Sequence, residues 1–330
     1  MSLRRRALLA AGAAGLSVAA WPARAQGTAA VAAWPHKPLR FIVPNAPGSS
    51  VDTIGRLLMA ELSKSLQQAA VADNRAGAAG ALGAEAARIS APDGHTLLIG
   101  STTAISTAPL LQKAARYDPL ADFDLISLVA VLPNVLVCHP GLPVKSLRDL
   151  IAYAQSKGDR SNMASAGIGS ASHLAGVAFQ AAAGFTSLHV PYKGGSQGVA
   201  SVVSGETDWV LTPAPAAMSL VAGNRLRLLG HSLAAHTRPL GDTPSIATTV
   251  PGFEFAGWIG LLGPRGLPAA VTATLGDAVA KALRVHELTQ AFELNGAVAT
   301  PSSPAEFRRF LERDIATNKR AIAIAGIQPE

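Results

Sequence analysis

The stretch 39–52, LRFIVPNAPGSSVD, begins as an apolar run typical of a β-strand, passes through a turn rich in proline and glycine, and leads into a helix. The helix is expected over 52–66, because apolar residues recur there at helical spacing. Such a turn leaves backbone N–H groups and the positive end of a helix pointing out from the carboxyl edge of the strand, where an anion fits. The same residues also admit an ordinary helix start, capped by Ser50 or Asp52.

The strands and helices that follow predict an α/β fold. Strands at 70–72 and 96–99 alternate with helices, an order typical of a parallel sheet covered on both faces. The alternation restarts at a strand over 134–139 and a helix over 147–156, which Ser146 is expected to cap. Further strands are expected at 162–165, 188–192, 208–211 and 226–229, and the last helices at 269–283, 285–295 and 303–325.

Two long apolar segments, 125–132 and 253–262, are interpreted as crossover strands between two α/β lobes. The first lobe then consists of 26–130 and 254–330, and the second lobe of 131–253. A cleft between two such lobes is the default ligand site.

The strand–turn–helix arrangement recurs in the second half at 165–173, SAGIGSASH. Its glycines permit close backbone approach, and its three serine hydroxyls can donate to a carboxylate or cap the helix. His173 stands at the expected helix start, where the helix dipole disfavours protonation, so we expect a neutral, hydrogen-bonding imidazole.

Two further turns end strands and carry polar residues. In 190–195, VPYKGG, Tyr192 offers a wall and a hydroxyl, and Lys193 offers a charge unless it is simply solvated. The side chains of the turn 101–103, STT, can likewise contact a ligand or simply be solvated. The candidate ligand-binding residues of the four turns are Ala46, Gly48, Ser49, Ser50, Asp52, Ser101, Thr102, Thr103, Ser165, Ala166, Gly167, Gly169, Ser170, His173, Tyr192 and Lys193.

Motifs for catalysis, metals or nucleotides are missing from the sequence. Ser170 does not lie in G-x-S-x-G, since Ile168 precedes Gly169 and Ser172 occupies the place of the last glycine. Neither G-x-G-x-x-G nor G-x-x-x-x-G-K-[ST] occurs, and the histidines are spread singly. No catalytic residue, metal or cofactor is therefore expected. A serine hydrolase that uses Ser170 and His173 remains the alternative, because catalytic groups can meet in space.

The first residues read as a secretory signal peptide over 1–25. Three arginines precede an apolar run over 7–21, and Ala23-Arg24-Ala25 is a small-x-small cleavage pattern. The order Arg5-Arg6-Ala7-Leu8-Leu9 also resembles a twin-arginine signal. Cleavage after Ala25 removes four arginines and no acidic residue, so the formal net charge falls from +7 to +3. The remaining basic residues are scattered among acidic ones, which disfavours a nucleic-acid partner.

Together these segments resemble the substrate-binding proteins of tripartite tricarboxylate transporters, the Bug or TctC-like family. The resemblance covers nearly all of the chain after the signal peptide. It is carried by KPLRFIVP (37–44) with Pro47, Gly48 and Asp52, NRAGAAG (74–80), PDGHTLL (92–98), YDP (117–119), ASAG (164–167) with Gly169 and Ser170, HLAG (173–176) and HVPYKG (189–194).

The resemblance implies a two-lobed type II periplasmic-binding fold, each lobe a mainly parallel sheet flanked by helices. It further implies a monomeric periplasmic receptor that has no cofactor and holds a small di- or tricarboxylate, or a related organic acid, largely by backbone groups. The large and small membrane components of a permease are the implied partners. Where the family often has a second acidic residue in the cleft, this chain offers Thr212, an additional candidate ligand contact. An amino-acid ligand would lose an ammonium partner there, which favours a plain carboxylate.

Overall fold

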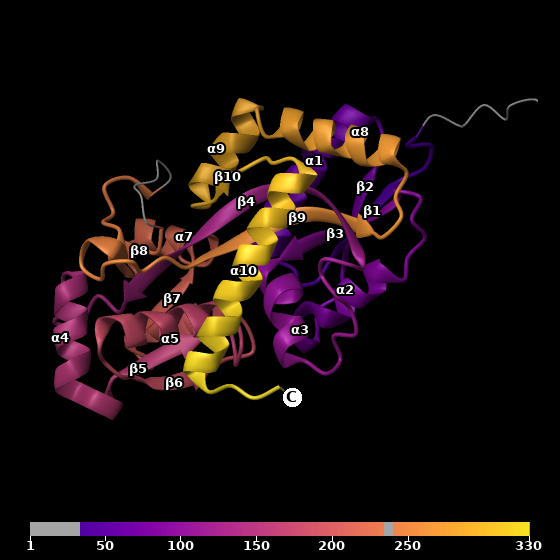
Figure 1. Cartoon of the computed structure of the whole chain (residues 1–330). Helices are drawn as coiled ribbons and strands as arrows, with labels where there is room; N and C mark the ends of the chain where they lie inside the picture. Colours follow the sequence, from indigo (N-terminus) through magenta and orange to yellow (C-terminus); the bar gives the residue numbers. More distant parts are fainter. Residues whose placement is uncertain (1–33, 234–239, 330) are drawn as a thin grey trace, which may run out of the picture. The chain divides into compact units, whose positions relative to one another are not determined.

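A computed structural model of the chain describes residues 34–233 and 240–329 and shows helices packed around a long, curled β-sheet (Figure 1). The expected signal peptide, 1–25, lies outside the described residues. Contacts divide the chain after Trp34, and the unit that begins at Pro35 contains every described helix and strand. None of the described helices combines the length and the apolar character that a membrane span requires.

The strands form one sheet in the order β2-β1-β3-β9-β4-β7-β5-β6, and β8 and β10 also pair with β4. β1 pairs in parallel with β2 and β3, and β5 pairs in parallel with β6 and β7. Every pair that involves β4 or β9 is antiparallel, so the sheet is mixed. The strand bounds are β1 Leu39–Val43, β2 Ala70–Asn74, β3 Thr96–Ser101, β4 Phe123–Cys138, β5 Asn162–Ser165, β6 Leu188–Pro191, β7 Trp209–Pro213, β8 Arg227–His231, β9 Ala256–Pro264 and β10 Val298–Ala299.

Helices cover the sheet on both faces (Figure 1). Their bounds are α1 Ser50–Leu66, α2 Ala81–Arg88, α3 Ala108–Leu111, α4 Leu147–Lys157, α5 Ala171–Ala183, α6 Gly195–Ser204, α7 Met218–Ala222, α8 Ala269–Ala282, α9 His286–Leu294 and α10 Pro304–Ala325. Short helical turns are η1 Ala78–Gly80, η3 Gly158–Arg160, η4 Ala214–Ala216 and η6 Ile246–Thr248, and η2 Thr102–Thr107 is a π-helix.

The predicted helix starts agree with the observed ones to within two residues, and α1, α4 and α10 each begin at a serine cap. Ser146 caps α4 as predicted, with its side chain accepting from the amide of Asp149. α1 begins two residues earlier than expected, because Ser49 is the cap rather than Ser50 or Asp52. α10 begins with a capping box between Ser303 and Glu306, which satisfies two N–H groups at once.

β4 is a single strand where the sequence predicts two, over 125–132 and 134–139. Pro133, between the two predicted segments, has no N–H to donate to a neighbouring strand. In the structure Pro133 lies where β4 changes partner, since Pro133 is level with Ala256 of β9 and Asn134 with Pro213 of β7. The missing donor therefore falls at the transition between the two halves of the sheet.

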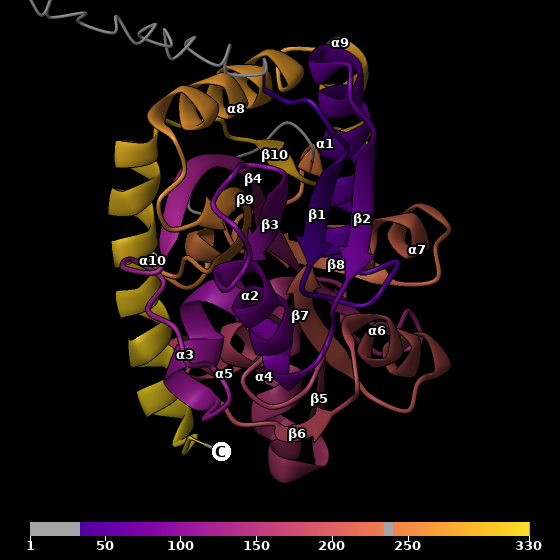
Figure 2. The ribbon, with the colours of Figure 1, turned by 90° about the vertical axis from the view of Figure 1, so that its right-hand side faces the viewer.

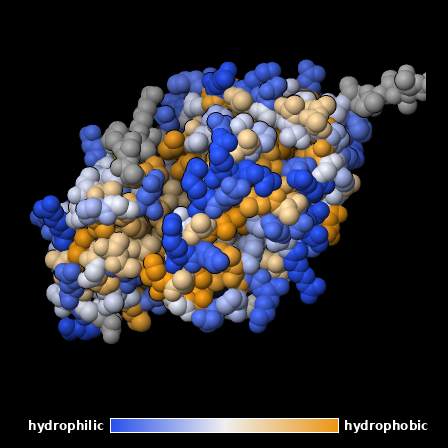
Figure 3. Space-filling view, in the orientation of Figure 1, coloured by the Kyte–Doolittle hydropathy of each residue, from blue (hydrophilic) through white to orange (hydrophobic). Residues whose placement is uncertain are grey.

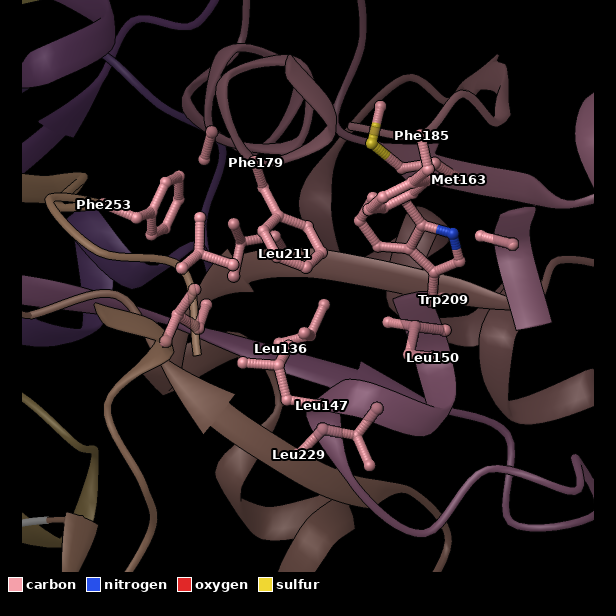
Figure 4. Packing of buried hydrophobic residues seen from close by; sticks show 14 of the residues in the cluster. Leu136, Leu147, Leu150, Met163, Phe179, Phe185, Trp209, Leu211, Leu229 and Phe253 are labelled. Atoms are coloured by element: carbon pink, nitrogen blue, oxygen red, sulfur yellow. The ribbon is translucent and has the colours of Figure 1, made fainter. Parts of the chain in front are cut away.

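Each half of the sheet has its own hydrophobic core. In the second half, Phe179 of α5 packs edge-to-face against Phe185, Trp209 and Phe253 (Figure 4). Trp209 is fully buried between α5 and the neighbouring strands. Burying a phenylalanine-sized side chain stabilises a fold by about 1.5–3 kcal/mol, so this aromatic group anchors the second half.

α10 contributes to both cores. Phe307 and Leu311 near its start belong to the core of the first half, whereas Ala321 near its end belongs to that of the second half. Figure 2 shows α10 running along the side of both halves. The lobe boundaries expected at 130/131 and 253/254 stay a prediction. They assign all of α10 to the first lobe, whereas the end of α10 packs on the core of the second half.

Candidate functional site

The directions of the strands bring the ends of both sheet halves to one place. β3 is antiparallel to β9, and β9 is antiparallel to β4, so β1 and β3 run in the same direction as β4. β7 is antiparallel to β4, and β5 and β6 run with β7. The carboxyl ends of β1 and β3 therefore point toward those of β5, β6 and β7. We call the region between these two sets of strand ends the junction.

The strand register gives the scale of the junction. β3 ends at Ser101, which is level with Ile259 of β9 and through it with Ala130 of β4. β7 ends at Pro213, level with Asn134 of β4. Four residues of extended chain separate these two levels, which corresponds to about 13 Å measured along β4.

The turn after β1 is held in shape by Asp52. Its carboxylate accepts from the amide of Gly48 at 2.9 Å, from Nδ2 of Asn74 at 2.8 Å and from Nε of Arg56 at 2.9 Å. Burial alone would raise the pKa of Asp52, but these three hydrogen bonds together hold it below its ordinary value. Asp52 is 3% exposed and is occupied in building the turn.

The outer part of this turn has free donors. Ala46 and Gly48 are exposed, and Ser49 and Ser50 are half-buried. Among the described residues, the amides of Ala46, Ser50 and Val51 donate to no protein acceptor. The last two belong to the first turn of α1, where the helix dipole is positive.

The turn after β3 is η2, which the sequence indicated only as a polar turn. Ser101 caps it by accepting from the amide of Ala104. Oγ1 of Thr102 accepts from the amide of Trp258 at 2.9 Å, so this hydroxyl joins η2 to β9. Thr103 is half-buried, and its hydroxyl has no partner in the part of the chain that the structure describes. Of the three predicted residues, Thr103 alone has a side chain free to meet a ligand.

The turn after β5 folds back on its own side chains. The amide of Ala166 donates to Oγ of Ser172 at 2.9 Å, and the amide of Gly167 donates to Oγ of Ser165 at 3.0 Å. Oγ of Ser170 donates to the carbonyl of Gly167 at 2.6 Å and also caps α5. Two of the amides that the sequence suggested for an anion are therefore occupied inside the turn.

The rest of this turn faces the first half of the sheet. A Cβ atom at Gly169 would lie 2.4 Å from Cδ1 of Leu111 in α3, so the turn packs closely against the other half. In the described chain, the amides of Ile168, Ala171 and Ser172 donate to no protein acceptor. The start of α5 thus offers free donors opposite those at the start of α1.

Two stacked histidines lie behind the turn. Nδ1 of His173 accepts from the amide of Gly169 at 3.0 Å, which assigns the ring proton to Nε2. His189 stacks on it with ring centroids 3.8 Å apart, and Nε2 of His189 lies 2.6 Å from Oγ of Ser165. Burial, with a smaller effect of His189, lowers the pKa of His173 to about 4. Both the predicted neutral imidazole and the predicted helix-start position fit this arrangement.

Neither Ser170 nor His173 is set up for nucleophilic catalysis. A nucleophile needs a base within hydrogen-bonding reach. Oγ of Ser170 instead bonds to backbone groups and Ser172, and Nδ1 of His173 is taken by Gly169. The described residues contain no group of three or more side chains that would hold a metal ion.

Three predicted contacts near strand ends of the second half differ in their surroundings: Tyr192, Lys193 and Thr212. Tyr192 packs against the hydrophobic cluster under α6. Lys193 is exposed, and its backbone amide donates to Gln197. Thr212 is buried in β7, one residue from the strand end that faces the junction. Sequence reasoning missed His189 and Asn74, since neither lies within the turn that it supports.

Two hollows lie outside the junction. One of about 940 Å³ lies between α8 and the start of α10, and one of about 750 Å³ lies between α5, His189 and the end of α10. Figure 3 shows the outward face of α10 as a hydrophilic band with hydrophobic surface on either side. Apart from His173, which lines the second hollow, none of the predicted ligand contacts belongs to these two hollows.

Comparison with known proteins identifies one family, as the sequence profile and the similar solved structures show. The sequence profile of the tripartite tricarboxylate transporter family receptor, TctC, matches residues 54–327. The solved structure of Rhodopseudomonas palustris Rpa4515 with adipate is similar, with 32% identity, a TM-score of 0.85 and coverage of 90% of this chain and 100% of that one. The periplasmic binding protein BugD is similar at 25% identity, a TM-score of 0.81 and coverage of 90% and 100%. MatC from R. palustris, with bound malate, is similar at 28% identity, a TM-score of 0.78 and coverage of 87% and 99%.

Proposed function

Since this chain belongs to the tripartite tricarboxylate transporter receptor family of periplasmic solute-binding proteins, we propose that it captures a small dicarboxylate in the junction and delivers it to a membrane permease. The permease would consist of one large and one small membrane component. Export by cleavage of the signal peptide after Ala25 is part of the proposal.

The observation that carries the proposal is the pair of helix starts on opposite sides of the junction. α1 begins with free amides at Ser50 and Val51, and α5 with free amides at Ala171 and Ser172. Free amides at a helix start favour a negatively charged group. Two such ends that face each other suit a ligand with a carboxylate at each end.

The ligands of similar proteins support a short dicarboxylate. The solved structures of two similar proteins hold adipate and malate, and each of these ligands carries two carboxylates on a short carbon chain.

The charges around the turns favour a ligand without an ammonium group. The carboxylate of Asp52 is buried and already accepts from Arg56 and Asn74. Thr212, at the position where the family resemblance implies an acidic residue, offers no charge to an amine. An amino acid would therefore bury its ammonium group without a counter-charge, which is unfavourable.

Closure of the two halves over the ligand would bend the chain where β4 and the segment before β9 pass between them. The two connections are bonded to each other, since Nδ2 of Asn134 donates to the carbonyl of Phe255 at 2.8 Å. The amide of Phe255 also donates to the carbonyl of Ser232, whose own amide donates to the carbonyl of Asn134. A ligand that contacts both halves stabilises the closed form, which the permease would recognise.

Calorimetric titration of the mature protein tests the proposal. Adipate and malate are compared with hexanoate, which lacks one carboxylate, and with glutamate, which adds an ammonium group. We expect saturable one-to-one binding of at least one dicarboxylate, and binding at least about tenfold weaker for hexanoate and glutamate because an unpaired buried donor or charge remains. Tighter binding of glutamate or hexanoate than of both dicarboxylates would contradict the proposal.

A further inference from the structure

η2 is an unusual element at the edge of the junction. Its six residues, Thr102–Thr107, form a π-helix directly after β3. A π-helical turn is rare and occurs mostly as a local feature at functional sites, so it needs support from its surroundings. Part of that support comes from Tyr117, whose hydroxyl donates to the carbonyl of Ala104.

The remaining support comes from Asp314 on α10. One oxygen of its carboxylate accepts from Oγ of Ser106 and also from Nε1 of Trp258, the latter at 2.7 Å. Trp258 also donates its backbone amide to Thr102. The start and the far side of η2 are thus both tied to Trp258, once directly and once through Asp314.

Two of the three groups of this arrangement lie in the interior, whereas Asp314 is half-buried beside a hollow between α10 and the segment before β9. Ser106 and Trp258 are each 1% exposed, so their donors have no access to water. Burial raises the pKa of Asp314 to about 6, although hydrogen bonds from Ser106, Trp258 and Asn318 lower it in part. At neutral pH the carboxyl is therefore ionised in a place that disfavours charge. One carboxylate oxygen of Asp314 thus serves two buried donors from two different elements, Ser106 of η2 and Trp258 of β9.

We propose that Asp314 is a positioning residue of the ligand site, which holds η2 against Trp258 and α10 so that Thr103 and its neighbours keep their place at the junction. The inference rests on the proposed function, because it assumes that the junction binds the ligand. Since α10 packs on the cores of both halves, Asp314 also ties the ligand-facing turn to the helix that spans them.

The test compares three variants of the mature protein in titrations with adipate and malate. Asp314→Ala removes the acceptor of two buried donors, and its affinity for the dicarboxylate that wild type binds should fall at least about tenfold. Asp314→Asn keeps an oxygen that accepts both bonds, and its affinity should stay within about threefold of wild type. Glu312→Ala, an exposed position on the same helix, is the control and should bind as wild type does.

Amide hydrogen exchange without ligand separates positioning from simple support of the fold. In Asp314→Ala the amides of η2 should exchange at least about tenfold faster than in wild type, while the amides of β5 and α5 keep their rates. Unchanged affinity or unchanged η2 exchange in Asp314→Ala would overturn the inference. If this variant does not fold, Ser106→Ala, which removes one donor only, must show the same two changes in weaker form. Failure of wild type to bind any dicarboxylate would refute the proposed function, and the exchange measurement would still decide whether Asp314 holds η2.

Discussion

Acidification should destabilise this protein through His173, and replacing that histidine with asparagine should remove this part of the pH dependence. The folded chain disfavours protonation of His173, because the ring is buried and its Nδ1 already accepts from Gly169. Below its ordinary pKa of 6.5, the unfolded chain takes up a proton that the folded chain takes up only near pH 4. Unfolding therefore becomes more favourable as the pH falls from 6.5 to about 4.

The size of the effect follows from the two pKa values. The difference between 6.5 and about 4 corresponds to a loss of about 3 kcal/mol of unfolding free energy between neutral pH and pH 4. In His173→Asn, Oδ1 takes the place of Nδ1 as the acceptor for Gly169, so the turn is kept and the titrating group is lost. The variant should therefore lose about 3 kcal/mol less than wild type over this range.

Urea unfolding at several pH values from 7.5 to 4 measures this difference. The quantity of interest is the unfolding free energy of wild type minus that of His173→Asn, because groups away from this site contribute equally to both proteins. His286→Asn, at an exposed position in α9, is the matched control. A difference between wild type and His173→Asn that stays constant from pH 7.5 to 4 would refute the reasoning.

Three further substitutions have defined outcomes. Asp314→Asn should raise the unfolding free energy at pH 7.5 by up to about 3 kcal/mol, because the pKa of the Asp314 carboxyl is raised to about 6 in the folded chain and its ionised form therefore destabilises the fold. In urea titrations this gain should disappear below pH 4, where the carboxyl is protonated in both the folded and the unfolded chain. Ser170→Ala removes the cap of α5 and should lower stability by about 1 kcal/mol. Its affinity for a dicarboxylate should fall only severalfold, and a loss above a hundredfold would make Ser170 a direct contact. Gly167→Val should lower stability by at least about 1 kcal/mol in the same assay, because Gly167 has φ +115° and a Cβ there would lie 3.1 Å from the carbonyl oxygen of Tyr192; wild-type stability would contradict this.

The parts of the fold that local signals encode could be predicted from the sequence. β1, the turn after it and α1 were predicted because periodicity and capping residues lie next to one another. β4 was divided in two because the apolar pattern alone does not show that one strand pairs with both halves of the sheet. η2 was missed because a π-helix depends on tertiary support, and Ser106 and Asp314 lie 208 residues apart.

The candidate site was predictable only as a set of turns. Strand ends and glycines indicated where the turns lie, and those positions border the junction. Which amides remain free depends on where side chains such as Ser172 and His173 point after folding. Tyr192 shows the same limit, because its packing under α6 depends on a helix that follows it in the chain.

The central claim is that a dicarboxylate lies in the junction between the starts of α1 and α5. Hydrogen–deuterium exchange of the mature protein, with and without a saturating concentration of the dicarboxylate that binds most tightly, tests it directly. We expect protection at Ser50 and Val51, at the turn 168–172 and at Thr103, with no change around the hollow between α8 and α10. Protection confined to that hollow or to the one between α5 and the end of α10, with the three junction segments unchanged, would contradict the account.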